Sequence, residues 1–126
     1  MTEYSNTAYD LLPLREPTFY ILLSLANGKK HGYAILKDIE QLSEGKVRLS
    51  TGTLYEALAR LLEQNLIERV SDEAESNALQ KVSAHPGKPR KGYHLTPFGK
   101  QVLEAETHRL RTLVTAAWGR LGQQNV

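Results

Sequence analysis

Residues 49–62 restrict most strongly what this chain can fold into, because their apolar side chains follow a helical period. At 100° per residue, one side of the predicted helix carries Leu54, Ala57, Leu58, Leu61 and Leu62, and the other carries Gly52, Glu56, Ala59, Arg60 and Glu63. Ser50 and Thr53 are both candidate N-caps, so the start of the helix presents hydroxyl and N–H groups that suit an anion. Taken alone, this stretch fits an ordinary amphipathic surface helix better than a binding element.

The length of 126 residues allows one domain with a modest core and a short appendage. The sequence has no run of about 18 apolar residues and no charged-then-apolar leader, so we expect no membrane partner and a cytoplasmic location. It contains no cysteine, which excludes a disulfide framework and Cys-ligated zinc.

Charge is separated along the chain although the net charge is only +2. Residues 76–103 contain no acidic side chain, whereas acidic residues crowd just before them at Asp72, Glu73 and Glu75. The basic residues of this tract are Lys81, Lys88, Arg90, Lys91 and Lys100. Such a tract is typical of an element that faces phosphate groups.

Two shorter helices are predicted before residue 49. Residues 19–26 are apolar on nearly every side, and they end at Asn27-Gly28, so this helix should be buried on several sides. Residues 33–42 repeat apolar side chains at helical spacing, and residues 46–49 alternate as a brief extended link. The helix at 33–42 and the helix at 50–64 together make a helix-turn-helix candidate.

Residues 66–70 and 92–95 alternate in polarity and predict the two strands of a hairpin with a long polar tip at 71–91. A helix-turn-helix followed by a hairpin is the winged-helix arrangement. The predicted fold class is therefore mainly α with a small β-hairpin. Lys88, Arg90 and Lys91 lie in this wing, where they can reach phosphates or an adjacent minor groove.

The last predicted helix starts at Thr96-Pro97, an N-cap followed by a proline at the first helical position, and it runs to about Gly122. Its length of roughly 39 Å is long for so small a domain. Apolar residues recur on it in a seam that Glu106 and Thr107 interrupt: Leu103, Leu110, Leu113, Val114, Ala117, Trp118 and Leu121. We therefore expect a two-fold homodimer, with an N-terminal arm at 1–15, a winged helix-turn-helix DNA-binding domain at 16–95 and a dimerisation helix at 96–126.

Several fragments, in this order, resemble the PadR family of bacterial transcriptional regulators. They are residues 19–26, residues 31–35, Gly52-Thr53-Leu54-Tyr55 with Leu58, Arg60 and Leu61, residues 66–68, and residues 90–99. The resemblance implies a dimeric winged-helix repressor that binds an inverted-repeat operator and is released by an effector. The single C-terminal helix is similar to the shorter branch of the family. The chain departs from the family at Glu56, where proline is common, and in its longer wing.

The start of the helix at 50–64 supplies the first expected DNA contacts, at Ser50, Thr51 and Thr53, with a pure capping role as the alternative. The resemblance implies that Tyr55 meets the DNA backbone, and packing against the wing fits nearly as well. Arg60 can donate to guanine and Glu56 can accept from cytosine. Alternatively, these two side chains form an exposed ion pair four residues apart.

Three further DNA contacts are expected near residue 31. Lys29 and Lys30 should neighbour phosphates, and a solvated loop is the alternative. The resemblance implies a phosphate contact for Tyr33, and a half-buried core tyrosine is the alternative.

A small aromatic effector is the one further ligand expected. Some family members bind flat drugs in an apolar gap at the dimer centre, and the resemblance implies that Phe19 or Trp118 lines such a gap, although dimer packing fits both residues better. His31, His85, His94 and His108 lack metal-ligand spacing. No phosphate-binding glycine loop, nucleophile elbow or carboxylate pair indicates catalysis, so we expect no metal, no cofactor and no enzyme activity.

These observations predict a sequence-specific transcriptional regulator that binds double-stranded DNA as a homodimer and acts as a repressor. The alternative is a dimeric winged-helix module that docks a protein without binding DNA. The two differ in salt dependence, because DNA binding releases counterions and weakens steeply as salt rises.

Overall fold

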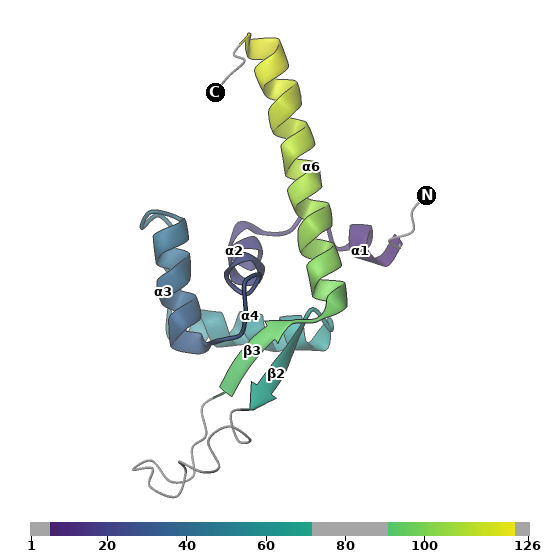
Figure 1. Cartoon of the computed structure of the whole chain (residues 1–126). Helices are drawn as coiled ribbons and strands as arrows, with labels where there is room; N and C mark the ends of the chain where they lie inside the picture. Colours follow the sequence, from purple (N-terminus) through teal and green to yellow (C-terminus); the bar gives the residue numbers. More distant parts are fainter. Residues whose placement is uncertain (1–5, 72–90, 123–126) are drawn as a thin grey trace, which may run out of the picture.

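The computed structural model describes residues 6–71 and 91–122, which form a helical body with a small sheet and one long projecting helix (Figure 1). In chain order the elements are α1 (Asn6–Asp10), α2 (Glu16–Ser24), β1 (Lys30–His31), α3 (Gly32–Leu42), α4 (Thr51–Glu63), β2 (Ile67–Ser71), β3 (Lys91–Leu95) and α6 (Pro97–Leu121). The predicted class, mainly helical with a small sheet, is confirmed.

Helix α4 begins at Thr51 because Ser50 is extended, with φ −77° and ψ 162°, and caps the helix with its side chain. The Ser50 hydroxyl accepts a hydrogen bond from the Thr53 backbone N–H at 3.1 Å and donates to the Thr53 hydroxyl at 2.9 Å. Of the two candidate caps, Ser50 is therefore the N-cap. After the helix, Asn65 adopts a φ of 63°, and this left-handed residue turns the chain towards β2.

The sheet has three antiparallel strands in the order β1-β3-β2. Strand β3 pairs with β2, where Ile67 faces Leu95, and its other edge pairs with β1, where His31 faces Gly92. The predicted hairpin is confirmed, and β1 adds a short third strand that the sequence did not reveal. Two residues are too few to show an alternating pattern.

The core lies between α2, α3, α4, the sheet and the first half of α6. Its large buried side chains are Ile21, Leu22, Leu25, Ile35, Ile39, Leu54, Leu58, Leu61, Leu66, Ile67, Tyr93 and Val102. The predicted apolar stripe of α4 is confirmed, because Ala57 and three of its leucines are buried and Leu62 packs against the same core. Full burial of one Leu or Ile side chain contributes about 1.5–3 kcal/mol. The stripe therefore decides which side of α4 stays outside.

Helix α6 is joined to the end of α4 by hydrogen bonds around Thr96. The Thr96 hydroxyl donates to the Asn65 carbonyl at 2.7 Å and accepts from the Gly99 N–H at 2.9 Å. The Thr96 N–H donates to the Leu66 carbonyl at 3.1 Å. Thr96 is thus the N-cap that the sequence predicts, and it holds the start of α6 against the turn that follows α4.

The two halves of α6 differ in burial. Residues up to Glu106 contribute buried side chains such as Val102 to the core, whereas every side chain from Arg111 to Leu121 is exposed except the half-buried Trp118. Three large apolar side chains in this second half are 53%, 52% and 66% exposed, namely Leu113, Val114 and Leu121. Figure 1 shows this half extending beyond all the other helices.

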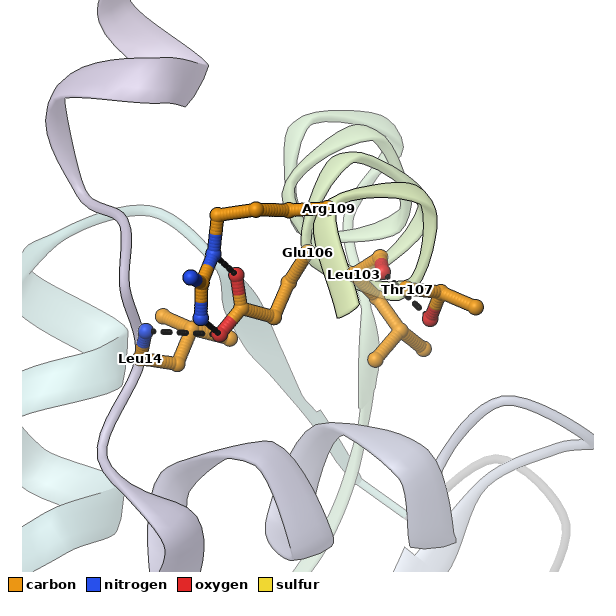
Figure 2. Close-up of polar contacts among 5 residues, drawn as sticks. All are labelled: Leu14, Leu103, Glu106, Thr107 and Arg109. Carbon is orange, nitrogen blue, oxygen red and sulfur yellow. Dashed lines mark hydrogen bonds and ion pairs between the residues drawn. The ribbon is translucent and has the colours of Figure 1, made fainter. Parts of the chain in front are cut away.

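A buried carboxylate ties the N-terminal segment to α6 (Figure 2). One oxygen of Glu106 accepts a hydrogen bond from the Leu14 backbone N–H at 3.0 Å, and both oxygens accept from the Arg109 guanidinium, at 2.7 and 2.9 Å. The bonds from Arg109 lower the pKa of Glu106; burial opposes this shift, and the Leu14 N–H adds to it. Helix α1 also packs against α6 and buries Ala8 completely.

The two polar interruptions of the predicted α6 seam thus have local roles. Glu106 is only 2% exposed and anchors the segment before α2. Thr107 donates its hydroxyl to the Leu103 carbonyl at 2.8 Å, within the helix (Figure 2). Neither residue interrupts the helix itself.

Candidate nucleic-acid interface

The outward face of α4 is open to solvent along its whole length. Its exposed residues are Thr51, Gly52, Thr53, Tyr55, Glu56, Ala59, Arg60 and Glu63. They lie opposite or beside the buried stripe, as the helical period predicts. In Figure 1, α4 crosses the foot of the body, at the end opposite to the projecting half of α6. Within residues 6–71 and 91–122, this face is therefore accessible to an external partner.

The start of α4 offers backbone donors. Ser50 accepts from the N–H of Thr53, which leaves the N–H groups of Thr51 and Gly52 without a partner inside the helix. A Cβ at Gly52 would meet no atom within 4 Å, so the space beside it is open. Free N–H groups and the positive end of the helix dipole together suit a phosphate group.

Tyr55 packs on the first residue of α3. A Cβ at Gly32 would overlap the Tyr55 hydroxyl, so the glycine makes room for that ring. The Tyr55 side chain nevertheless remains 46% exposed. The contact joins the first turn of α3 to the outward face of α4, and it places a phenol group between the two helices of the helix-turn-helix.

Tyr33 follows Gly32 in the first turn of α3 and is 71% exposed, which excludes the core alternative considered for it. The ammonium group of Lys37 lies 5.6 Å from the centre of its ring, a cation–π contact one turn along the helix. Lys37 is thus a further basic residue of this surface besides Lys29, and it lies next to Tyr33. In the sequence, only its position four residues after Tyr33, which puts both side chains on one face of the helix, indicates this contact.

The two lysines before α3 have different surroundings. The Lys30 ammonium group donates to the Ser24 carbonyl at 2.6 Å and to the Asn27 side-chain oxygen at 2.7 Å, and it lies 3.9 Å from an Asp38 carboxylate oxygen. Lys30 therefore stabilises the end of α2, where backbone carbonyls carry partial negative charge. The Lys29 side chain instead lies along Gly92 of β3.

The predicted wing contacts fall largely outside the described residues. Lys88 and Arg90 belong to residues 72–90, and of Lys91 only the backbone is described, at the start of β3. On the described part of the hairpin, Arg69 of β2 is exposed. Next to Arg69, Glu68 of β2 faces His94 of β3, and His94 Nε2 lies 3.0 Å from Glu68 Oε1.

The residues expected to bind an effector are not brought together within one chain. Phe19 is partly buried on α2 and meets Tyr20 edge-on, with 6.4 Å between ring centres, whereas Trp118 lies in the projecting half of α6. A groove of about 340 Å³ between α2, β3 and α6 contains neither aromatic residue. Its lining residues are Leu23, Ala26, Leu95, Lys100, Leu103, Glu104, Thr107, His108 and Arg111.

The ranges 6–71 and 91–122 contain no group of three His, Asp or Glu side chains placed to hold a metal ion. No helix in the same ranges combines the length and the apolar character needed to cross a membrane.

The sequence model of the transcriptional regulator PadR-like family matches residues 21–105, from α2 to the buried part of α6. Among curated proteins, an uncharacterised 37.1 kDa protein in a transposon of Streptomyces fradiae is 36% identical over 93 residues. The match covers 74% of this chain and 22% of that relative, so the chain spans about a fifth of the relative's length.

Solved structures share the fold. A PadR-like transcriptional regulator from Bacillus cereus has a TM-score of 0.62 at 22% identity, covering 95% of this chain and 100% of the other. A PadR family transcription regulator from Clostridium difficile has a TM-score of 0.60 at 28% identity, covering 84% and 97%. Bacillus subtilis PadR, solved in complex with operator DNA, has a TM-score of 0.56 at 23% identity, covering 72% and 46%.

The described residues thus have the winged helix-turn-helix fold of these regulators, followed by one long helix. Since the family model matches more than half of the sequence, from α2 through α6, the chain belongs to the PadR-like family of transcriptional regulators.

Proposed function

We propose that this protein is a sequence-specific DNA-binding repressor that acts as a homodimer on an inverted-repeat operator. The observation that carries the proposal is the open face of α4, with free backbone donors at its start and no described element over it. The structure of Bacillus subtilis PadR with operator DNA supports the same use of this fold here. A repressor of this kind works in the cytoplasm, where a bacterial operator is found.

The surroundings of the described residues support a division of their DNA contacts, and Lys88, Arg90 and Lys91 are included for their place in the basic tract of the sequence. We assign phosphate contacts to the start of α4 and to Lys29, Tyr33, Tyr55, Lys88, Arg90 and Lys91. We assign base contacts to Thr51, Thr53 and Arg60, whose side chains are all exposed on α4. Ser50 acts as the N-cap, because its hydroxyl accepts a hydrogen bond from the Thr53 N–H and donates one to the Thr53 hydroxyl. We assign no DNA contact to Lys30, because its ammonium group donates hydrogen bonds to Ser24 and Asn27 at the end of α2.

The projecting half of α6 supports the proposed dimer. Leu113, Val114 and Leu121 are more than half exposed on the projecting half of α6, which no described element covers. Ala117 and the half-buried Trp118 continue the same seam, while Leu103 is already buried in its own chain. A second copy covers such a seam with the same surface. Because α6 is hydrogen-bonded to the end of α4, the dimer fixes the distance between the two α4 helices, at roughly 34–36 Å for half-sites one turn apart.

A small aromatic effector is a further part of the proposal. Trp118 lies on the dimer seam, so flat compounds that enter an apolar gap between two copies would quench its fluorescence. Phe19 lies on α2, away from the projecting half of α6. It lines the same gap only if α2 of the partner chain packs beside the seam or if the gap extends to α2 of the same chain. A broad panel of planar compounds without any quenching would argue against this site.

The salt dependence of duplex binding tests the proposal. Each phosphate contact should make log K fall by about 0.9 per unit of log salt, so wild-type protein with several contacts should show a steep slope. A winged-helix module that docks a protein would bind no duplex even at low salt. Absence of duplex binding at low salt would therefore contradict the proposal and favour the docking module.

A further inference from the structure

Two carboxylates occupy the centre of the outward face of α4. At 100° per residue, Gly52, Glu56, Ala59 and Glu63 lie within about 60° of one another, directly opposite the buried Leu54 and Leu61. Glu56 and Glu63 are exposed. A face that approaches DNA would ordinarily be neutral or basic, because each carboxylate is repelled by the phosphates.

No residue that the structure describes neutralises Glu56. Arg60 lies one turn further along α4, yet no ion pair joins it to Glu56, and no other cation pairs with Glu56 in the part of the chain that the structure describes. Other acidic residues differ, since Glu40 pairs with Arg48 at 3.1 Å and Glu106 with Arg109 at 2.7 Å. The alternative of an exposed Glu56–Arg60 pair is therefore not realised.

The neighbours of Glu56 on the stripe cannot shield it. Gly52, one turn towards the start of the helix, has no side chain and open space beside it, and Ala59 on the next turn has only a methyl group. Glu56 is thus the first long side chain on the centre line of α4, counted from the end that offers free N–H donors. When that end enters a major groove, the Glu56 carboxylate is the first side-chain group of the centre line to reach the base edges.

A carboxylate distinguishes the four bases by the groups they present in the major groove. Cytosine presents an amino group without a neighbouring acceptor on its own edge, which a carboxylate can accept from. Guanine and thymine present carbonyl or ring-nitrogen acceptors, and these repel it. Adenine places its amino group beside an acceptor nitrogen, so the contact is weaker than with cytosine.

We propose that Glu56 is a specificity-determining residue that requires a cytosine at one position of each half-site and lowers affinity for every other sequence. The inference rests on the proposed function of α4 as the DNA-reading helix. The guanidinium of Arg60, on the adjacent side of the helix, is paired with no described residue, and it can donate to a neighbouring guanine at the same time.

The test compares Glu56→Gln with Glu63→Gln, a matched control that removes the same charge from the same stripe near the other end of α4. A half-site is first defined by selecting bound duplexes with wild-type protein from a random pool. Affinity is then measured for wild type and both variants on duplexes that carry each of the four bases at every half-site position, at one salt concentration.

Glu56→Gln should bind non-cognate duplexes more tightly than wild type, and its preference for cytosine at one position should fall at least about fivefold, the lower end of what one good base contact contributes. Glu63→Gln should raise affinity without changing any base preference. Unchanged base preferences in Glu56→Gln would overturn the inference while the DNA-binding function stands. Failure of wild-type protein to select any duplex would instead overturn the proposed function.

Discussion

Gly99 of α6 packs directly against the backbone carbonyl of Leu66, so closely that a Cβ at position 99 would overlap the carbonyl oxygen. The obstructing atoms belong to the backbone, so no side-chain rotation can relieve the overlap. With the Thr96 hydrogen bonds, this contact sets where the long helix starts relative to the end of α4. The geometry of the proposed dimer therefore depends on a glycine that is not itself part of the seam.

Gly99→Ala should lower the free energy of unfolding by about 1–3 kcal/mol, because the added methyl group forces the backbone apart. Gly119→Ala is the matched control on the same helix, since a Cβ there would meet no atom within 4 Å. The control should gain roughly 0.5–1 kcal/mol, because alanine loses less conformational entropy in a helix than glycine. Urea unfolding measures the change in the free energy of unfolding for each variant. A gain in stability for both variants would contradict the close packing at Gly99.

Glu106 should make stability depend on pH in the acidic range. Hydrogen bonds from Arg109 lower its pKa in the folded protein. The carboxylate therefore contributes stability that is fully present above the unfolded-state pKa of about 4.3 and is lost as pH falls through the lower folded-state pKa. Glu106→Gln should cost about 1.5–3 kcal/mol at pH 7, because charge-assisted hydrogen bonds are lost.

Unfolding measured from pH 7 to pH 2 checks the Glu106 prediction. The difference between wild type and Glu106→Gln should shrink as the wild-type carboxylate is protonated. Glu104→Gln, an exposed neighbour on α6, should show little effect at any pH. A Glu106→Gln deficit that stays constant down to pH 2 would show that the charge of Glu106 contributes nothing.

Val114→Asp combined with Leu121→Asp should separate the proposed dimer, because burial of two unpaired carboxylates in an apolar seam is strongly unfavourable. Sedimentation should then give a single copy of 14.1 kDa, with operator affinity greatly reduced. Thr115→Asp, next to Val114 but off the seam, is the control and should remain dimeric. An intact dimer in the double variant would contradict the seam.

Arg90→Ala combined with Lys91→Ala should weaken binding to all duplexes alike and flatten the salt slope by about 0.9 for each phosphate contact removed. Thr51→Ala should instead alter base preference and leave the slope almost unchanged. Titration of one specific and one unrelated duplex over several salt concentrations separates the two effects. A slope equal to that of wild type would remove the wing from the proposed contacts.

Local patterns predicted much of this fold, because they report directly on burial and capping. The apolar stripe of α4 and the N-cap with proline at Thr96-Pro97 are properties of neighbouring residues, and both are present in the structure. The choice between Ser50 and Thr53 needed the backbone angles, since both residues carry the same functional group.

Contacts between distant residues could not be predicted in this way. Glu106 is read from sequence as a break in a seam, because its partner Leu14 lies 92 residues away. Lys30 is read as one more basic residue near a phosphate site, and only the folded chain turns its ammonium group to the end of α2. The fit of Tyr55 over Gly32 likewise arises where two helices cross.

Selection of bound duplexes from a random pool tests most directly whether two copies of the chain present their α4 helices to successive turns of DNA. The account predicts enrichment of an inverted repeat whose half-site centres lie about 10–10.5 base pairs apart. Recovery of no enriched sequence at low salt, or of single half-sites without a repeat, would contradict it.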